Sequence, residues 1–271
     1  MKRKIALFMT MVLLAAAMSG CASAGNKEES EPLVVAMELA YPPFETKDDA
    51  GEPEGVSVDL MEAFGEYVGR EIQIKNTAWD GLIPALQTGS ADIVISSMTI
   101  TDERKEVIDF SDPYANALLA ILANADSDIA SIEDLNQEGK IIAVKSGSTG
   151  HMYAEKNLTR AKVLAMPDES ACVMEVSQGR ADGFIYDQLT IYRNWQNNQD
   201  TTKAVFIPFQ DPEQWGIAVQ KGNTELLDQI NAFLAEYREK GGYEELTGKY
   251  LTEEKKAFDE LGFQWFFEIA E

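Results

Sequence analysis

Short apolar runs and amphipathic segments alternate along the chain. The runs LVVAM at 33–37 and EIQIK at 71–75 have the composition and period of β-strands. Between them, DLMEAFGEYVG at 59–69 spaces its apolar side chains as a helix does, and its final glycine is typical of a helix end. A short helix, DGLIPALQTG at 80–89, and a buried strand, ADIVIS at 91–96, are expected next. This alternation predicts an α/β fold with a largely parallel sheet.

The second half of the chain repeats this scheme. KIIAV at 140–144 and ADGFIYD at 181–187 are expected strands, and MPDESACVMEVSQG at 166–179 is an expected helix that its proline opens and its glycine closes. Both halves also contain a helix, a glycine, one further residue, Ala-Asp and a buried strand, as GSAD at 89–92 and GRAD at 179–182. Two lobes of similar topology would explain this recurrence. Chance is the alternative, because a glycine often ends a helix before a strand.

The first twenty residues have the pattern of a secretion signal. MKRK is basic, IALFMTMVLLAAA is apolar but short for a membrane span, and MSGC ends at Cys21 after small residues. The pattern resembles a bacterial lipoprotein signal, in which the cysteine is lipidated and starts the mature chain. An ordinary signal peptide with a chance cysteine is the alternative. We therefore expect a signal peptide at 1–20, a flexible tether at 21–31, and a lipid on Cys21 that holds the chain at a membrane surface.

The chain is strongly acidic, with a formal net charge of −23. Cleavage before Cys21 removes Lys2, Arg3 and Lys4 and no acidic residue, which lowers this charge by three, to −26. A polyanion of that kind repels the phosphates of nucleic acids and the headgroups of anionic lipids. Nucleic acid is therefore not expected among the partners.

Few residues are available for metal or nucleophilic chemistry. The one histidine is His151, and no cysteines or histidines have the spacing of a zinc site. A Ser-His-Asp triad has almost no material, although His151 alone can still act as an acid or base. With Cys21 lipidated, Cys172 is the only thiol left, and its apolar helical neighbours predict a buried structural cysteine without a disulfide. We expect neither a metal nor a cofactor.

Hydroxyl residues and an arginine follow the strand at 91–96, in the sequence SSMTITDER at 96–104. Such hydroxyls often cap the next helix and such an arginine is often solvated, so this stretch alone does not define a site. Three further polar segments stand at the ends of expected strands: ELAYPPF at 38–44, KSGSTG at 145–150 and YDQ at 186–188. Open α/β sheets bind ligands at the C-terminal ends of their strands, so the four segments predict a ligand site.

The chain resembles the family 3 extracellular solute-binding proteins, which are the amino-acid receptors of ABC importers. The resemblance is carried by YPPFE, by the G-x-x-x-D spacing from Gly55 to Asp59, and by WDGLIPALQTGSADIVISSMTITDERKEVIDFSDPY, SIEDLNQEGKIIAVKSGSTG and GRADGFIYD. It implies a type II periplasmic-binding-protein-like fold, in which two α/β lobes, each a mostly parallel sheet flanked by helices, are joined by two hinge strands. It places residues 32–122 and 215–271 in lobe 1 and residues 123–214 in lobe 2.

The resemblance also implies roles for individual residues. Arg104 matches the arginine that holds the ligand α-carboxylate, for which a guanidinium offers paired charge-assisted hydrogen bonds that lysine cannot reproduce. Asp187 matches the aspartate that binds the ligand ammonium group. The other matches are hydroxyl residues near the ligand head group and aromatic residues that flank its side chain: Ser96, Ser97, Thr99, Ser148, Thr149, Tyr41 and Trp79. Without the resemblance, Asp187 would be interpreted as a solvated carboxylate and the aromatic residues as ordinary packing residues.

Two charged residues are expected at the side-chain end of the same cleft. Glu38 occupies a family position that often meets a polar or cationic side chain, and Lys145 begins KSGSTG. Together they nearly cancel in charge and offer an acceptor and a donor, which suits the amide of glutamine. Arginine or lysine is the alternative if Lys145 points to solvent, with Trp79 and Tyr41 stacking on the cation. A further alternative is that Glu38 and Lys145 simply pair with other protein groups.

These expectations describe a non-catalytic receptor that closes on an L-amino acid, with Arg104 and Thr149 holding the carboxylate from opposite lobes. We expect a monomer outside the cytoplasm that delivers its ligand to the permease subunits of an ABC transporter. The alternative from another class is an enzyme similar to cyclohexadienyl or arogenate dehydratase on the same fold, with Glu38 or His151 as its acid. A sensor input domain has little support, because no second hydrophobic span or signalling domain follows residue 250.

Overall fold

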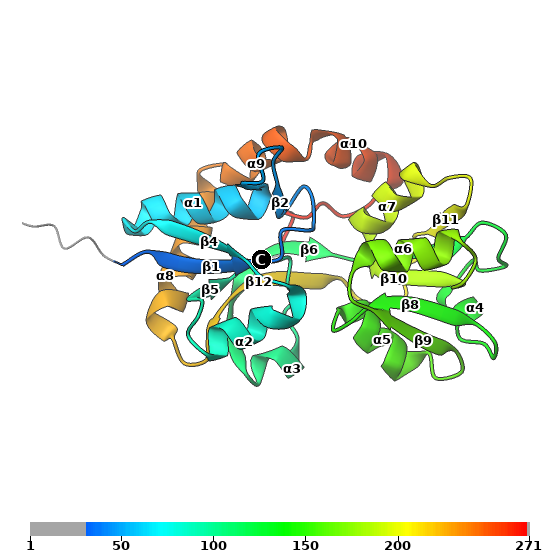
Figure 1. The fold of residues 1–271 in the computed structure, drawn as a ribbon. Helices are drawn as coiled ribbons and strands as arrows, with labels where there is room; N and C mark the ends of the chain where they lie inside the picture. The colour runs from blue at the N-terminus through cyan, green and yellow to red at the C-terminus, as the bar shows by residue number, and fades with distance from the viewer. Residues whose placement is uncertain (1–30, 270–271) are drawn as a thin grey trace, which may run out of the picture. The chain divides into compact units, whose positions relative to one another are not determined.

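The computed structural model describes residues 31–269, which contain two five-stranded sheets (Figure 1). The first sheet has the spatial order β4 (Ile72–Asn76), β1 (Leu33–Met37), β5 (Ile93–Val94), β12 (Glu213–Gln220) and β6 (Ile108–Ala117). The second sheet has the order β11 (Thr202–Val205), β7 (Leu119–Asn124), β10 (Gly183–Asp187), β8 (Ile141–Lys145) and β9 (Lys162–Met166). A short hairpin pairs β2 (Thr46–Lys47) with β3 (Pro53–Glu54). The predicted signal peptide and Cys21 lie outside the described residues.

Each sheet combines parallel and antiparallel pairing. β1 is parallel to β4 and β5, and β8 is parallel to β9 and β10, as the alternation of strands and helices predicted. β6, β7, β11 and β12 are antiparallel to their neighbours, and they belong to the two segments that carry the chain between the sheets. The chain enters the second sheet at Leu118, between β6 and β7, and returns between β11 and β12. The expected lobe boundaries at 122 and 215 fall inside β7 and β12, and the lobe ranges stay a prediction.

Helices cover both faces of each sheet (Figure 1). On the first sheet, one face carries α1 (Val56–Val68), α8 (Thr224–Glu239), α9 (Gly242–Tyr250) and α10 (Thr252–Leu261), and the other carries α2 (Leu82–Gln87). On the second sheet, α4 (Ile132–Leu135) and α5 (Thr149–Asn157) lie on one face, and α6 (Glu169–Ser177) and α7 (Gln188–Asn197) lie on the other. Two short helices, η1 (Trp79–Gly81) and α3 (Asp102–Lys105), complete the first half. Because both faces are covered, neighbouring side chains of β1 such as Val35 and Ala36 are both fully buried.

Helices α1 and α6 test three local predictions. α1 ends as predicted, with Gly69 in the left-handed conformation at a φ of 69°. The expectation that Pro167 opens α6 is wrong, because the next residue, Asp168, caps the helix by accepting the Ala171 N–H at 2.8 Å. A carboxylate satisfies a free N–H of the first turn, which a proline cannot do. Cys172 is fully buried in α6, which confirms its predicted structural role.

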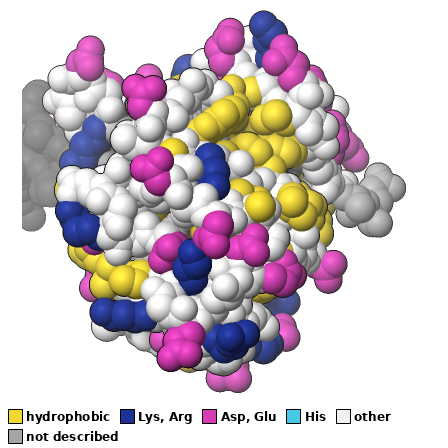
Figure 2. All heavy atoms as spheres, turned by 90° about the vertical axis from the view of Figure 1, so that its right-hand side faces the viewer, with side chains coloured by type: hydrophobic (Ala, Val, Ile, Leu, Met, Phe, Trp, Pro, Cys, Tyr) yellow, Lys and Arg dark blue, Asp and Glu magenta, His cyan; other side chains and the backbone are white. Residues whose placement is uncertain are grey.

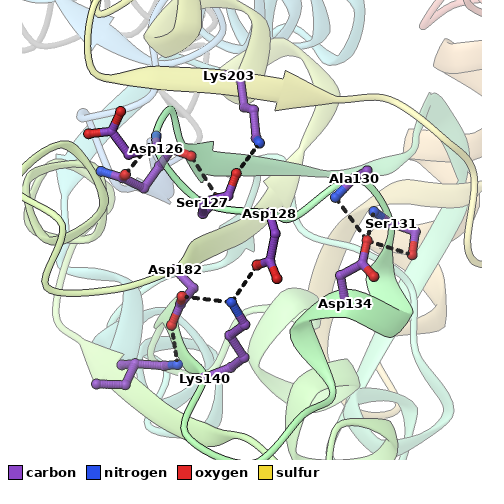
Figure 3. Close-up of polar contacts among 11 residues, drawn as sticks. Asp126, Ser127, Asp128, Ala130, Ser131, Asp134, Lys140, Asp182 and Lys203 are labelled. Atoms are coloured by element: carbon purple, nitrogen blue, oxygen red, sulfur yellow. Dashed lines mark hydrogen bonds and ion pairs between the residues drawn. The ribbon is translucent and has the colours of Figure 1, made fainter.

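The repeated Gly-x-Ala-Asp sequences make the same connection in both sheets. Asp92 accepts a hydrogen bond from the Val34 N–H of β1 at 2.8 Å. Asp182 accepts one from the Ile141 N–H of β8 at the same distance, and Figure 3 shows Lys140 bound to the same carboxylate. Gly89 and Gly179, which begin the two sequences, have positive φ angles of 71° and 68°, which glycine adopts without strain. The recurrence in the sequence therefore corresponds to one type of helix-to-strand connection used twice.

The face at the second-sheet end carries both apolar and charged side chains. Figure 2 shows hydrophobic side chains gathered in its upper part, with acidic side chains near them. Large apolar side chains that are exposed among the described residues include Met174 on α6 and Ile207 after β11. Within residues 31–269, none of the helices combines the length and the apolar character needed to cross a bilayer.

Candidate functional site

One cavity is lined by all eleven residues that the sequence predicted for a ligand site. They are Glu38, Tyr41, Trp79, Ser96, Ser97, Thr99, Arg104, Lys145, Ser148, Thr149 and Asp187. The lining is completed by Tyr186, which lies in the YDQ segment noted above, and by three residues that the sequence analysis did not single out: Leu119, Glu213 and Trp215. The cavity has a volume of about 40 Å³, so the side chains around it lie close together.

Strand geometry explains why these residues meet. Glu38 follows β1 and Ser96 follows β5 in the first sheet, whereas Lys145 ends β8 and Asp187 ends β10 in the second. Parallel neighbours present their C-terminal ends at the same edge of a sheet, and the two edges line one cavity. The Glu38 N–H donates to Ser96 Oγ at 3.0 Å, which ties two of these strand ends together.

We define the head-group end of the cavity by the residues expected to bind the ligand head group, which are Arg104, Thr99, Thr149 and Asp187. The Arg104 guanidinium is buried, Nη1 donates to the Thr99 carbonyl at 2.7 Å, and Nη2 donates to the Gly147 carbonyl at 3.0 Å. A guanidinium has five N–H donors, so two such bonds leave donors for a ligand. Burial lowers the pKa of Arg104, but an arginine still keeps its charge in proteins.

Asp187 is buried at the end of β10, where it also caps α7. Its Oδ1 accepts the Leu189 and Thr190 N–H groups, both at 3.0 Å, and the Tyr41 hydroxyl at 2.7 Å. Burial raises the pKa of Asp187, and hydrogen bonds such as those from Thr190 and Tyr41 oppose that shift. The interpretation of Asp187 as a solvated carboxylate is therefore wrong. Tyr41 also does more than flank the cavity, because its hydroxyl joins the first-sheet side to Asp187.

Lys145 and Glu38 pair with each other at what we define as the side-chain end of the cavity. The Lys145 side chain is 2% exposed and Nζ binds Glu38 Oε2, so Lys145 does not point to solvent. Nζ also lies 5.2 Å from the centre of the Trp79 ring, at a distance typical of a cation–π contact. Glu38 Oε1 accepts a hydrogen bond from the backbone N–H of Trp79 at 3.3 Å. Glu38 and Lys145 therefore pair with each other within the protein and also line the cavity, and their role toward a ligand stays a prediction.

Glu213 is the charged residue of the cavity that sequence reasoning missed. It begins β12, and its Oε2 accepts the hydroxyl protons of Thr99 at 2.8 Å and Thr149 at 2.9 Å. Burial raises the pKa of Glu213, against these bonds and the charge of Arg104. The chain has 46 acidic residues, and no local signal distinguishes Glu213 from the rest. Its position two residues before the apolar run WGIAV is the one hint that the sequence offers.

Ser148 and Ser97 line the cavity and also have roles in the local structure. Ser148 caps α5 by accepting the His151 N–H at 3.1 Å. His151 is not among the residues that line this cavity, and its Nδ1 accepts the Gly147 N–H. Ser97 has a φ of 48°, which is uncommon outside glycine and places its side chain beside the buried Glu45.

Over residues 31–269, no group of three or more His, Cys, Asp and Glu side chains is arranged to hold a metal ion.

Comparison with known proteins identifies the family. Residues 33–253 match the sequence pattern of the bacterial extracellular solute-binding proteins, family 3. The probable histidine-binding protein of Neisseria gonorrhoeae is 34% identical over 251 residues, which span 89% of this chain and 92% of that protein. An ancestral arginine-binding protein bound to arginine is similar in structure with a TM-score of 0.76 and 37% identity, covering 82% of this chain and 99% of the other. An ancestral amino acid-binding protein, a precursor of cyclohexadienyl dehydratase, has a TM-score of 0.73 and 37% identity over 81% of this chain and 95% of its own. This chain therefore belongs to family 3 of the bacterial extracellular solute-binding proteins.

Proposed function

We propose that this protein captures a polar L-amino acid, glutamine first and arginine or lysine next, and delivers it to the permease of an ABC transporter. Membership in an extracellular solute-binding family indicates a location outside the cytoplasm, and the relatives compared above are amino-acid-binding proteins. The observation that carries the proposal is the presence of a buried cation and a buried carboxylate, Arg104 and Asp187, in one cavity.

This pair suits the two charges of an α-amino acid. Arg104 keeps N–H donors beyond those given to Thr99 and Gly147, and these would bind the ligand carboxylate in paired hydrogen bonds. The bonds to Asp187 engage Oδ1, which leaves Oδ2 for the ligand ammonium group. A zwitterion satisfies both buried charges at once, whereas a simple carboxylic acid or amine leaves one of them without a partner.

The side-chain end favours a neutral polar group. Glu38 and Lys145 nearly cancel in charge, and the Trp79 ring lies beside them. An amide would accept from Lys145 and donate to Glu38, whereas an apolar side chain would displace water from both without replacing it, at about 1–3 kcal/mol for each group. A cationic side chain would meet Lys145 as well as Glu38, which places arginine and lysine second.

Ligand binding would hold the two sheets together around the cavity. Arg104 bonds Gly147 and Tyr41 bonds Asp187, and each bond joins a residue from the first-sheet side to one from the second-sheet side. A ligand held by Arg104 and Asp187 adds contacts that a separated pair of lobes lacks, so it shifts the population toward the closed form.

A thermal-shift screen of the twenty amino acids tests the proposal. We expect the largest rise in melting temperature with glutamine, and Arg104→Ala should abolish the rise. A single large shift with leucine or another apolar amino acid would refute the polar pocket but leave the receptor intact. No shift with any amino acid would refute the receptor itself.

The dehydratase alternative is motivated by the structural similarity to a precursor of cyclohexadienyl dehydratase. An enzyme of that kind needs an acid over the substrate ring, and two residues were considered for it. Glu38 is engaged by Lys145, and His151 is outside the cavity lining, so binding is favoured over catalysis. Incubation of the protein with arogenate or prephenate, followed by assay for the aromatic product, separates the two functions, because a receptor forms none.

A lipid on Cys21 would hold the receptor at the membrane beside its permease. We expect Cys21→Ala to release the protein from the membrane fraction or to leave it unprocessed, because the lipid would be attached through the cysteine sulfur. Cell fractionation with labelled lipid measures this, and an unchanged labelled, membrane-bound variant would contradict it. The monomeric state and the independence from metals and cofactors likewise stay predictions.

A further inference from the structure

Glu213 joins the two sheets at the head-group end. Its Oε2 accepts the hydroxyl protons of Thr99 and Thr149, at 2.8 and 2.9 Å. Thr99 lies in the segment after β5 of the first sheet, and Thr149 begins α5 on the second. The other oxygen, Oε1, accepts the side-chain amide of Gln210 at 2.7 Å. Donors from three segments therefore hold one carboxylate in the wall of the cavity.

These bonds decide what the two hydroxyls offer a ligand. A hydroxyl has one proton, and Thr99 and Thr149 both donate theirs to Glu213, so toward the cavity they present lone pairs only. Lone pairs accept hydrogen bonds from an ammonium group and repel a carboxylate. The ligand carboxylate then depends on Arg104 and on backbone N–H groups.

The charged side chains of the cavity wall do not balance. Three are carboxylates, from Glu38, Asp187 and Glu213, and two are cations, from Arg104 and Lys145. A zwitterion with a neutral side chain adds no net charge. The occupied cavity then keeps one uncompensated negative charge in a space with little water. An amino acid with a cationic side chain cancels that charge. A proton on one of the carboxylates cancels it equally well.

We propose that Glu213 selects the net charge of the bound amino acid. When ionised, Glu213 favours an amino acid with a cationic side chain, and when protonated, it admits a neutral one such as glutamine. This rests on the proposed function, and it states which of the two ligand classes the receptor takes at a given pH.

Glu213 is the wall carboxylate suited to take up the proton. Glu38 is paired with Lys145, and Asp187 would meet the ligand ammonium group, so both keep an opposite charge in the occupied site. Arg104 is the cation that faces Glu213, and a ligand carboxylate competes for it. Burial already raises the pKa of Glu213, and partial loss of Arg104 to the ligand raises it further.

Other titratable groups near the cavity are distinguishable from Glu213. Tyr186 at β10 lines the same cavity, and burial raises its pKa well above the usual value, so it stays neutral. Burial raises the pKa of Glu45 and of Glu169 to about 8, but neither lines this cavity. Glu169 therefore offers a matched control, as a buried carboxyl that faces Lys145 instead of Arg104.

The expected signature is a difference in proton uptake between two ligands. Binding of L-glutamine should take up about one proton, so its affinity rises by up to about tenfold for each unit by which the pH falls. Binding of L-arginine should take up close to none. Calorimetry of the full-length chain with both amino acids, in buffers of different ionisation enthalpy and across the neutral range, counts these protons.

Two variants assign the effect to one residue. Glu213→Gln should remove the pH dependence of glutamine binding and lower the affinity for arginine relative to glutamine by about tenfold or more. Glu169→Gln should leave both features as in the unmodified chain. Thr149→Val keeps the ionisable carboxyl of Glu213 but removes a hydrogen bond that lowers its pKa, so the proton uptake should persist and move to higher pH.

The outcomes separate this proposal from the proposed function. Equal proton uptake with both amino acids in the unmodified chain overturns the role of Glu213, whether or not any variant folds. An unchanged ratio of affinities in Glu213→Gln overturns it as well. If neither glutamine nor arginine binds the unmodified chain at any pH, the polar-amino-acid receptor is refuted instead.

Discussion

The cations at the two ends of the cavity have different hydrogen-bond partners. At the head-group end, Arg104 donates to the carbonyls of Thr99 and Gly147, whereas at the side-chain end Lys145 pairs with the carboxylate of Glu38. A carbonyl has no net charge, so most of the Arg104 charge stays available to a ligand, with one carboxylate nearby to share it. The Lys145 charge is largely cancelled. Loss of Arg104, which would bind the carboxylate common to all amino acids, should therefore weaken every amino acid alike, whereas changes at the side-chain end should alter which amino acid binds.

The largest effect is expected on stability at the side-chain end. Lys145→Met removes a cation that is 2% exposed and leaves Glu38, 16% exposed, without its partner. Loss of one partner of a buried ion pair typically costs about 3–5 kcal/mol in the free energy of unfolding. Denaturant unfolding measures this cost.

A double variant shows whether the cost comes from the stranded charge. Lys145→Met combined with Glu38→Gln leaves no unpaired ion, so much of the stability should return. If the double variant is as unstable as the single one, lost packing is the cause, and the two cations of the cavity do not differ as described.

Arg104→Ala should cost about 2–5 kcal/mol of binding free energy, or roughly 30-fold to several-thousand-fold in dissociation constant. The reason is that the ligand carboxylate stays buried without its cation. Calorimetry should show this loss for every amino acid that binds. Arg180→Ala, at an exposed ion pair with Glu175, should leave affinity unchanged. Retained affinity for any one ligand in folded Arg104→Ala would contradict a common head-group site.

Asp187→Asn should weaken binding by about 1.5–3 kcal/mol, the usual contribution of a hydrogen bond to a charged group. The asparagine oxygen still caps α7, so the fold should persist. Asp168→Asn makes the same substitution at the cap of α6, outside the lining of this cavity, and should not change affinity. Equal losses in both variants would mean that helix capping, not the ligand, is being measured.

Local patterns and the family resemblance predicted much of the fold and of the candidate site. Strand and helix order follows from apolar periodicity, which depends only on near neighbours, and the end of α1 at Gly69 follows from one glycine. Four polar segments of the site were found because strand ends meet at a sheet edge, where segments distant in sequence come together. The individual residues, including Trp79, which lies outside those segments, came from the resemblance. The resemblance then gave Arg104 and Asp187 their expected roles, which stay predictions.

The sequence does not predict which residues pair with the buried charged groups. Lys145 and Glu38 are 107 residues apart, and Glu213 and Thr99 are 114 apart, so only the folded chain shows that they pair. The resemblance implied two hinge strands, but the residues of the antiparallel strands that link the sheets were not identified, because the composition of such a strand does not distinguish it from other strands. Glu213 lies at the start of one such strand, which explains why both were missed together.

Two further carboxyl groups, those of Glu45 and Glu169, are buried beside the cavity. Glu45 lies near Ser97, and Glu169 lies near Lys145. Burial raises the pKa of both from 4.5 to about 8, while the Lys145 charge opposes the shift in each. The native protein therefore holds a proton at each site that the unfolded chain releases above its ordinary pKa.

The last predicted effect is a dependence of the free energy of unfolding on pH. A carboxyl with a raised pKa stabilises the fold fully below about pH 4.5, and this contribution is lost as the pH rises toward about 8, by at most about 1.4 kcal/mol per pH unit for each group. Glu45→Gln keeps the shape of the neutral carboxyl, so it should flatten unfolding free energy against pH and be more stable than the unmodified chain near pH 8. Glu169→Gln should flatten it similarly, because its pKa is raised equally. Denaturant titrations at several pH values decide this, and an unchanged slope in Glu45→Gln would show that its native pKa is close to the ordinary value.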